Sequence, residues 1–176
     1  MNQVRTGIFE FRGKDAPVIG ADLKLGQQAP EFSAHNTEWQ IVKGLETSQG
    51  KVRIIGSLPS INTSVCDRET RRFNVEAAGL SEEIAILMVS MDLPYALRDW
   101  CAAAGIERVL TLSDHRNGEF GEKYGVLLQD QRIFRRAIFV VDRNDKIVYA
   151  DYMNKLGDEP NYEQVIAAAR AALGDG

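Results

Sequence analysis

Two mostly apolar runs limit what this chain can fold into more than any other feature of its sequence. Residues 52–58 and 84–91 are dominated by aliphatic side chains, which is typical of strands buried inside a sheet. The segment between them, residues 66–78, carries Phe73 and Ala77 at helical spacing. A buried strand, a helix and a second buried strand are therefore expected in this order.

The rest of the chain extends this alternation. Residues 6–18 alternate around Gly13 and predict a β-hairpin. We expect Asp92 to cap a helix that has Pro94 in its first turn and ends at Gly105. Further elements are expected at 31–34, 39–42, 109–112, 117–124, 136–142, 146–152 and 161–173. This order is typical of a thioredoxin-like α/β sandwich with an added N-terminal β-hairpin, forming a single domain over residues 1–176.

The net charge and the number and spacing of the cysteines exclude several classes of function. The net charge of -4 argues against a nucleic-acid-binding surface. We find neither a signal peptide nor a stretch long enough to span a membrane, which predicts a cytoplasmic protein. The 2 cysteines do not form a Cys-x-x-Cys pair, and no metal-ligand cluster or phosphate-binding loop accompanies them. We therefore expect neither a metal nor a cofactor, and the thiols themselves become the candidates for chemistry.

Cys66 lies where a helix begins, directly after a strand and a short loop. Free amides and the helix dipole at such a position stabilise an anion, and the thiolate is the reactive form of cysteine. Thr63 is one turn earlier, so its hydroxyl is expected to face the sulfur and bond both sulfur and peroxide. Pro59 starts the loop and is expected to shield the thiolate from water. The pattern favours attack of a thiolate on a peroxide, which produces a sulfenic acid.

An arginine near the sulfur would stabilise both the thiolate and the peroxide oxygen. Spacing alone does not choose among Arg68, Arg71, Arg72, Arg135 and Arg136. The first three are expected on a solvated helix face with the acids Asp67, Glu69 and Glu76. Of these acids, Asp67 and Glu69 are close enough in sequence to oppose ionisation of the thiol slightly.

The other thiol is ambiguous when it is considered alone. Leu97, Cys101 and Ala104 share one apolar helix face, which favours an inert core cysteine. The motif around Cys66 reverses this preference and favours a redox role for Cys101. A catalytic pair between a cysteine and His115 is a disfavoured alternative that the sequence leaves open.

Several separate motifs, in the right order, resemble one known family. The run Pro59-x-x-x-Thr63-x-x-Cys66 resembles the active-site motif of peroxiredoxins. Further matching segments are residues 71–74, 92–96, 112–117 and 120–126. Together they resemble the bacterial thiol peroxidase branch, an atypical two-cysteine peroxiredoxin, over about residues 6–173.

The resemblance implies specific roles. Cys66 matches the peroxidatic cysteine, Thr63 and Pro59 match its active-site partners, and Arg136 matches the arginine that contacts thiolate and peroxide. Cys101 matches the resolving cysteine, which forms an intramolecular disulfide with Cys66. The family also implies hydrogen peroxide and alkyl hydroperoxides as substrates, thioredoxin as reductant, and a homodimer.

Two positions depart from the family pattern, and one other function remains open. Asn62 stands where aspartate is more common, and Ser64 where proline or glycine is more common. Neither change removes a catalytic group. Because disulfide geometry requires Cα atoms within about 7 Å, local unwinding is expected around both Cys66 and Cys101 on oxidation. The alternative is a peroxide-sensing redox switch that signals through a partner protein without catalytic turnover.

Overall fold

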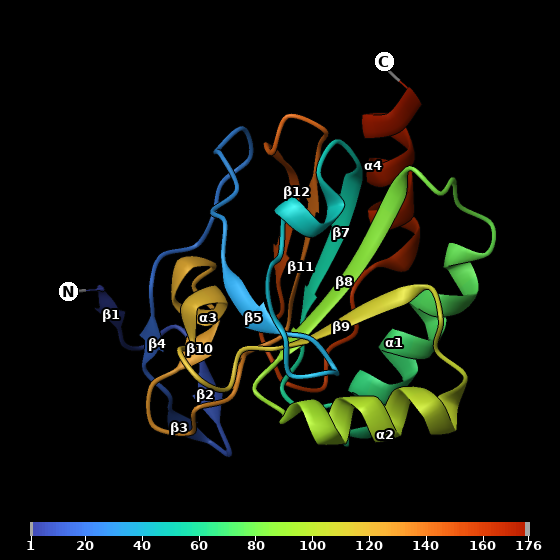
Figure 1. The fold of residues 1–176 in the computed structure, drawn as a ribbon. Helices are drawn as coiled ribbons and strands as arrows, with labels where there is room; N and C mark the ends of the chain where they lie inside the picture. The colour runs from blue at the N-terminus through green and yellow to red at the C-terminus, as the bar shows by residue number, and fades with distance from the viewer. Residues whose placement is uncertain (1, 175–176) are drawn as a thin grey trace.

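A seven-stranded mixed sheet forms the centre of the computed structural model, which describes residues 2–174 (Figure 1). The strand order is β12-β11-β7-β8-β9-β5-β6. These strands are β5 (Ser33–His35), β6 (Ile41–Lys43), β7 (Val52–Ser57), β8 (Ile84–Ser90), β9 (Val109–Ser113), β11 (Ala137–Val141) and β12 (Ile147–Tyr152). β7, β8 and β9 run parallel, and all other neighbours are antiparallel. The two apolar runs are adjacent central strands, as buried strands should be.

Helices cover both faces of this sheet. α1 (Ser64–Ala77), α2 (Pro94–Ala104) and α4 (Tyr162–Gly174) supply side chains to the core on one face. α3 (Glu119–Lys123) packs against β5 and contributes to the core on the other face (Figure 1). A 3-10 helix (Glu46–Ser48) lies in the loop before β7. The predicted α/β sandwich is confirmed.

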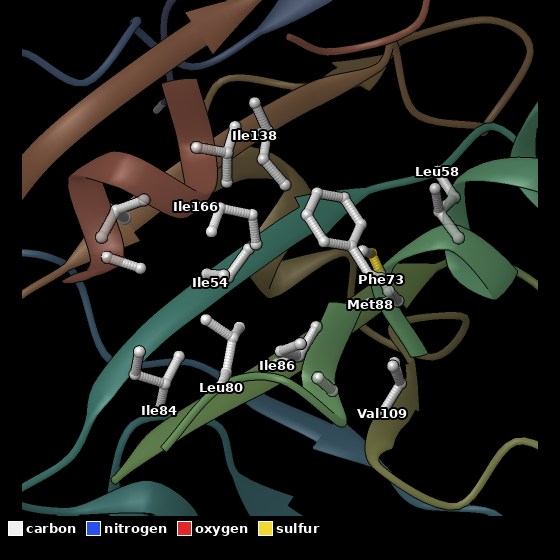
Figure 2. Close-up of a cluster of buried hydrophobic side chains, with 14 of the residues drawn as sticks. Ile54, Leu58, Phe73, Leu80, Ile84, Ile86, Met88, Val109, Ile138 and Ile166 are labelled. Atoms are coloured by element: carbon white, nitrogen blue, oxygen red, sulfur yellow. The ribbon is translucent and has the colours of Figure 1, made fainter. Parts of the chain in front are cut away.

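The larger core cluster fixes α1 on the sheet. Figure 2 shows Phe73 of α1 beside Leu58 and Met88, and Ile166 of α4 close to Ile54. Phe73 is 0% exposed, and burying one phenylalanine contributes roughly 1.5–3 kcal/mol. Because β7 ends just before α1 begins, this packing places the first turn of α1 beyond the carboxyl end of β7.

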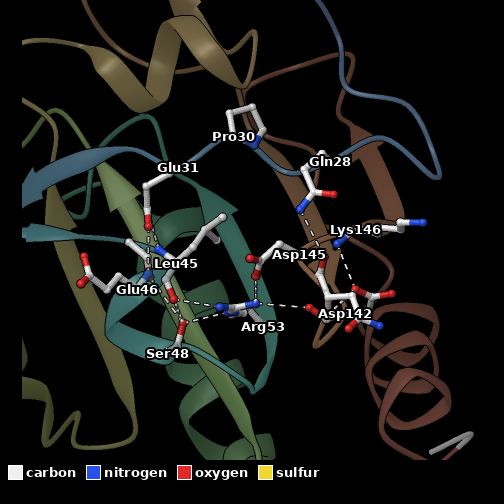
Figure 3. Close-up of polar contacts among 12 residues, drawn as sticks. Gln28, Pro30, Glu31, Leu45, Glu46, Ser48, Arg53, Asp142, Asp145 and Lys146 are labelled. Carbon is white, nitrogen blue, oxygen red and sulfur yellow. Dashed lines mark hydrogen bonds and ion pairs between the residues drawn. The ribbon is translucent and has the colours of Figure 1, made fainter.

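A buried arginine near the start of β7 joins this strand to two loops. The guanidinium of Arg53 is 1% exposed and donates to the Leu45 carbonyl at 2.8 Å and to the Ser48 hydroxyl at 3.0 Å (Figure 3). It also pairs with the Asp145 carboxylate at 2.5 Å in the turn between β11 and β12. A buried charge needs such partners. Arg53 is therefore a structural tie remote from Cys66.

The N-terminal segment forms more pairings than a single hairpin. β2 (Glu10–Phe11) and β3 (Lys14–Asp15) form the predicted tip, where Arg12 and Gly13 both have positive φ. The outer strands are β1 (Val4–Arg5) and β4 (Val18–Ile19). β4 also pairs with β10 (Leu127–Leu128), a strand absent from the sequence prediction. A strand of 2 residues is too short for its alternation to be recognised.

The helix after β8 begins differently from expectation. Gly105 ends α2 in the left-handed conformation at φ 66°, as predicted. However, its N-cap is Leu93, and the prediction that Asp92 caps this helix is wrong. The Asp92 carboxylate instead accepts hydrogen bonds from Ser60, Ile61 and Ser90. Between residues 2 and 174, no helix has the length and apolar character needed to cross a bilayer.

Candidate active site

Cys66 lies in the first turn of α1 and its residue is 0% exposed. Thr63 is the N-cap of this helix, with an extended backbone at φ -83° and ψ 146°. Its hydroxyl oxygen accepts a hydrogen bond from the Cys66 amide at 3.3 Å. This is the usual role of a threonine N-cap, because the first amides of a helix have no partner within the helix. The sulfur-bearing residue is thus held directly by the cap.

The Thr63 hydroxyl has a second partner in the loop. It donates to the Ser60 carbonyl at 3.1 Å, so its single proton is used within the loop. The expected hydrogen bond from this hydroxyl to the Cys66 sulfur is not among the contacts of the described residues. Contact between Thr63 and a bound peroxide stays a prediction.

Arg136 is the arginine that reaches the sulfur. One terminal nitrogen, Nη2, donates to Cys66 Sγ at 3.3 Å, and the other, Nη1, pairs with Glu69 Oε2 at 2.5 Å. The Leu156 carbonyl accepts a further hydrogen bond from Nη2 at 3.0 Å. Since the guanidinium is planar, three partners in different directions determine its orientation. The cation is 1% exposed and therefore acts at low dielectric.

The other candidate arginines have different partners. Arg135 is on the opposite side of the extended chain, where it pairs with Asp22 and lies over the Tyr152 ring at 4.3 Å. Arg71 and Arg72 form exposed ion pairs with Asp67 and Glu76 one turn away on α1. Arg68 lies 3.8 Å from Glu159. Neighbouring residues of an extended chain point to opposite sides, which separates Arg135 from Arg136.

Glu69 is the site residue that sequence reasoning missed. It was expected on the solvated face of the helix, but its side chain is 0% exposed and bonded to Arg136. Burial raises the pKa of the Glu69 carboxyl to about 7, although the positive charge of Arg136 opposes that rise. Burial by itself lowers the pKa of the Arg136 guanidinium. Attraction to Glu69 and to Cys66 is stronger than this effect, so the pKa of Arg136 is raised overall. The i, i+3 spacing from Cys66 was the available signal.

The loop that begins at Pro59 contains both buried and exposed residues. Pro59 and Ile61 are buried, whereas Asn62 and Ser64 are exposed. The two departures from the family pattern therefore lie at the surface of the loop, and the proline lies within it. Its proposed shielding of the thiolate stays a prediction.

Cys101 has a separate environment on α2. Its sulfur lies 3.4 Å from the hydroxyl of Thr111 on β9, and burial raises the pKa of its thiol. Cys101 is partly exposed, and both cysteines are free thiols. Because the thiolate is the reactive form of cysteine, this raised pKa disfavours Cys101 as the first nucleophile.

His115 belongs to a different cluster. Its Nδ1 atom lies 2.8 Å from the Ser113 hydroxyl, and its ring lies 5.0 Å from that of His35. The alternative of a catalytic pair between His115 and a cysteine has no counterpart in the hydrogen bonds of residues 2–174. Those residues also hold no cluster of three or more metal-ligating side chains.

The sequence of this chain is similar to those of known proteins. Residues 25–150 match the model of the AhpC/TSA family. A protein of Oceanobacillus iheyensis named "Thiol peroxidase" is 47% identical, and the match covers 89% of this chain and 94% of that protein. A Bacillus subtilis protein of the same name is 45% identical, with 93% of this chain and 96% of that protein covered.

Comparison with solved structures gives the same fold. A peroxiredoxin-like protein from Aquifex aeolicus superposes with a TM-score of 0.84 at 33% identity, covering 95% of this chain and 98% of that one. A thiol peroxidase from Chromobacterium violaceum superposes with a TM-score of 0.81 at 20% identity, covering 96% and 98%. The second likeness concerns the fold alone. These superpositions confirm the fold class predicted from the sequence.

Proposed function

Because the chain belongs to the AhpC/TSA family of peroxiredoxins, we propose that Cys66 is its catalytic nucleophile. Its relatives show that it is a peroxidase of the thiol peroxidase group. The observation that carries the proposal is the 3.3 Å hydrogen bond from Arg136 to the Cys66 sulfur. A buried, oriented guanidinium beside the sulfur stabilises the thiolate, and preorganised donors of this kind also stabilise charge that develops on a departing oxygen. Glu69 keeps the guanidinium in that orientation.

The first step is the oxidation of Cys66. Its thiolate attacks one oxygen of the hydroperoxide, the O–O bond breaks, and the departing alkoxide or hydroxide takes up a proton. The sulfur is oxidised to a sulfenic acid, and the peroxide is reduced to an alcohol or to water. Both hydrogen peroxide and alkyl hydroperoxides are proposed substrates. Thr63 and Pro59 are proposed to position the peroxide and to limit access of water.

The second step uses Cys101. Its thiol sulfur attacks the sulfenic sulfur, an S–S bond forms, and water leaves. A dithiol of the thioredoxin type then reduces the disulfide and returns both thiols. We further propose that the chain acts as a homodimer. Its extent as a single domain over residues 1–176 stays a prediction.

We propose that disulfide formation is accompanied by movement of both cysteines. Cys66 is held inside the first turn of α1 by the Thr63 cap and by Arg136, and Cys101 belongs to a separate helix. A disulfide needs Cα atoms within about 7 Å and matching directions of the side chains. Local opening of a helix end costs less than global unfolding. We propose that the start of α1 and the end of α2 unwind after oxidation of Cys66.

Thiol counting at stoichiometric peroxide tests the proposal. One equivalent of peroxide should remove both thiols of the wild type, and Cys66→Ser should consume no peroxide. Cys101→Ser should still form a sulfenic acid but should fail to turn over with thioredoxin, thioredoxin reductase and NADPH. Peroxide consumption by Cys66→Ser would overturn the assignment of the nucleophile. An intermolecular disulfide in the oxidised wild type would overturn the role of Cys101.

The same assay separates catalysis from sensing. Repeated turnover with the thioredoxin system supports a peroxidase that thioredoxin recycles. A single oxidation with no recycling by any dithiol would instead indicate a peroxide-sensing switch.

A further inference from the structure

The Asp92 carboxylate is a junction between the loop before Cys66 and the segment that leads into α2. Its Oδ1 accepts a hydrogen bond from the Ser60 hydroxyl at 2.8 Å. Its Oδ2 accepts one from the Ile61 amide at 2.8 Å and one from the Ser90 hydroxyl at 2.7 Å. Three donors from two segments thus converge on one carboxylate. Hydrogen bonds to an ionised acceptor are stronger than those between neutral groups.

The position of Asp92 is itself determined by the sheet. The Ser113 hydroxyl, at the end of β9, donates to the Asp92 carbonyl at 2.5 Å. The Ser90 hydroxyl, at the end of β8, also accepts the Asp92 amide at 3.2 Å. Two central parallel strands therefore fix both the backbone and the carboxylate of this residue. A group held on rigid strands is suited to position a loop.

Hydrogen bonds continue from Asp92 to the sulfur-bearing residue. The Ser60 carbonyl accepts both the amide and the hydroxyl of Thr63, each at 3.1 Å. The Thr63 oxygen in turn accepts the Cys66 amide. Ile61, whose amide bonds to Asp92, is 0% exposed and belongs to the core cluster that contains Cys66. The loop is thus pinned at Ser60 and Ile61, and the cap depends on that pinned loop.

We propose that Asp92 is a positioning residue for the peroxide step, acting through the loop and the Thr63 cap rather than by touching the substrate. Its carboxylate holds the start of α1 in the folded form that reacts with peroxide. The two hydrogen bonds from Ser60 and Ile61 must break, or the loop must bend around them, when the first turn of α1 unwinds. Asp92 therefore speeds oxidation of Cys66 and slows formation of the disulfide, and the latter effect rests on the proposed two-cysteine function.

Asp92→Ala tests the proposal by measuring the two steps separately. Rapid mixing with one equivalent of peroxide, acid quenching and mass spectrometry follow the sulfenic acid and the disulfide in time. Oxidation of Cys66 should slow by about tenfold, because misplaced reacting groups lose rate steeply. Disulfide formation should become faster, because the loop is already released. Asp130→Ala, which removes the same charge from an exposed turn, should change neither rate.

Conservative variants distinguish positioning from a general loss of stability. Asp92→Asn keeps an oxygen that accepts from the Ile61 amide and should return oxidation to within about threefold of the wild type. If Asp92→Ala does not fold, Ser60→Ala removes one arm of the junction and should change both rates in the same directions, by less. Asp92→Ala with wild-type oxidation, or with both steps slowed alike, would overturn the proposal.

The wild-type control keeps failure of this proposal distinct from failure of the proposed function. A wild type whose Cys66 thiol survives peroxide would contradict the function itself. A wild type that forms the sulfenic acid without a disulfide would contradict only the role of Cys101, and the oxidation rate would still test Asp92.

Discussion

The indole nitrogen of Trp100 donates a hydrogen bond to the Asp67 carboxylate at 2.8 Å, which joins the residue before Cys101 to the residue after Cys66. The Arg71 guanidinium pairs with the same carboxylate at 2.9 Å and lies 5.4 Å from the centre of the Trp100 ring. Hydrogen bonding from Arg71 lowers the Asp67 pKa and keeps the acceptor ionised. The two segments that we propose to move when the disulfide forms are therefore bonded to one another.

Loss of this bond should favour the disulfide. Trp100→Phe keeps an aromatic ring for Arg71 but removes the donor to Asp67. We expect faster disulfide formation and, at excess peroxide, less Cys66 oxidised to sulfinic acid, because the sulfenic acid survives for a shorter time. Mass spectrometry over a peroxide series measures the sulfinic fraction. Trp39→Phe is the matched control, and equal sulfinic fractions in the wild type and both variants would contradict the prediction.

Removal of the guanidinium should slow the peroxide step. Arg136→Met retains a long side chain but no donor and no charge. Loss of one preorganised donor to developing charge typically reduces rate by about 10²–10³-fold, and a similar loss is expected in the oxidation of Cys66. Stopped-flow oxidation of the reduced enzyme measures it. Arg135→Met is the control, because Arg135 contacts Asp22 and Tyr152 rather than the sulfur. An unchanged oxidation rate in Arg136→Met would show that another group stabilises the thiolate and the departing oxygen.

Glu69→Gln should have a smaller effect of the same sign. Glutamine can still accept a hydrogen bond from Arg136, but the ion pair that orients the guanidinium is lost. We expect oxidation to slow by less than in Arg136→Met. Glu76→Gln, at a partly exposed position, is the control on the same helix. A Glu69→Gln rate equal to that of the wild type would show that the negative charge of Glu69 is not needed to orient Arg136.

The cap at Thr63 should respond to loss of its hydroxyl. Thr63→Val keeps the shape of the side chain but removes the acceptor for the Cys66 amide, which typically costs about 1 kcal/mol. Amide exchange at Cys66 should become faster, and oxidation should slow. Thr63→Ser retains the oxygen and should preserve both. Fast exchange at Cys66 in the serine variant would contradict the assignment of this cap.

Asp114 should make the stability of the fold depend on pH. It is 2% exposed, and burial raises the pKa of its carboxyl from 3.8 to about 7. Between these values the folded state keeps a proton that the unfolded state loses, so this contribution falls as pH rises, on the order of 1 kcal/mol per pH unit. Asp114→Asn should therefore gain stability relative to the wild type as pH rises from about 4 to 7.

Urea unfolding at several pH values measures this difference. Asp130→Asn, at an exposed position, should show no comparable trend with pH. A difference between Asp114→Asn and the wild type that stays constant with pH would contradict burial as the cause of the raised pKa.

Local patterns were sufficient to predict the helices and the strands of the central sheet, in their order. The strands at 52–58 and 84–91 appear as β7 and β8 because an apolar run of that length has few ways to be buried. Gly105 ends α2 because its left-handed backbone favours glycine. The helix that carries Cys66 was predicted from its apolar spacing, although the role of Thr63 as its N-cap was not. These features all depend on near neighbours in the chain.

Contacts between distant segments decided the rest. Five arginines were candidates in the sequence, and only the path of the chain into β11 brings Arg136 to the sulfur. Glu69 was expected to be exposed, but the same guanidinium partners it inside the core. Asp92 was expected to cap its own helix, and the neighbouring loop takes up its carboxylate instead. The sequence determined the fold and the candidate nucleophile, because local pattern specifies them. The tertiary structure decided which charges surround the nucleophile, because a buried charge takes whichever partners the folded chain brings to it.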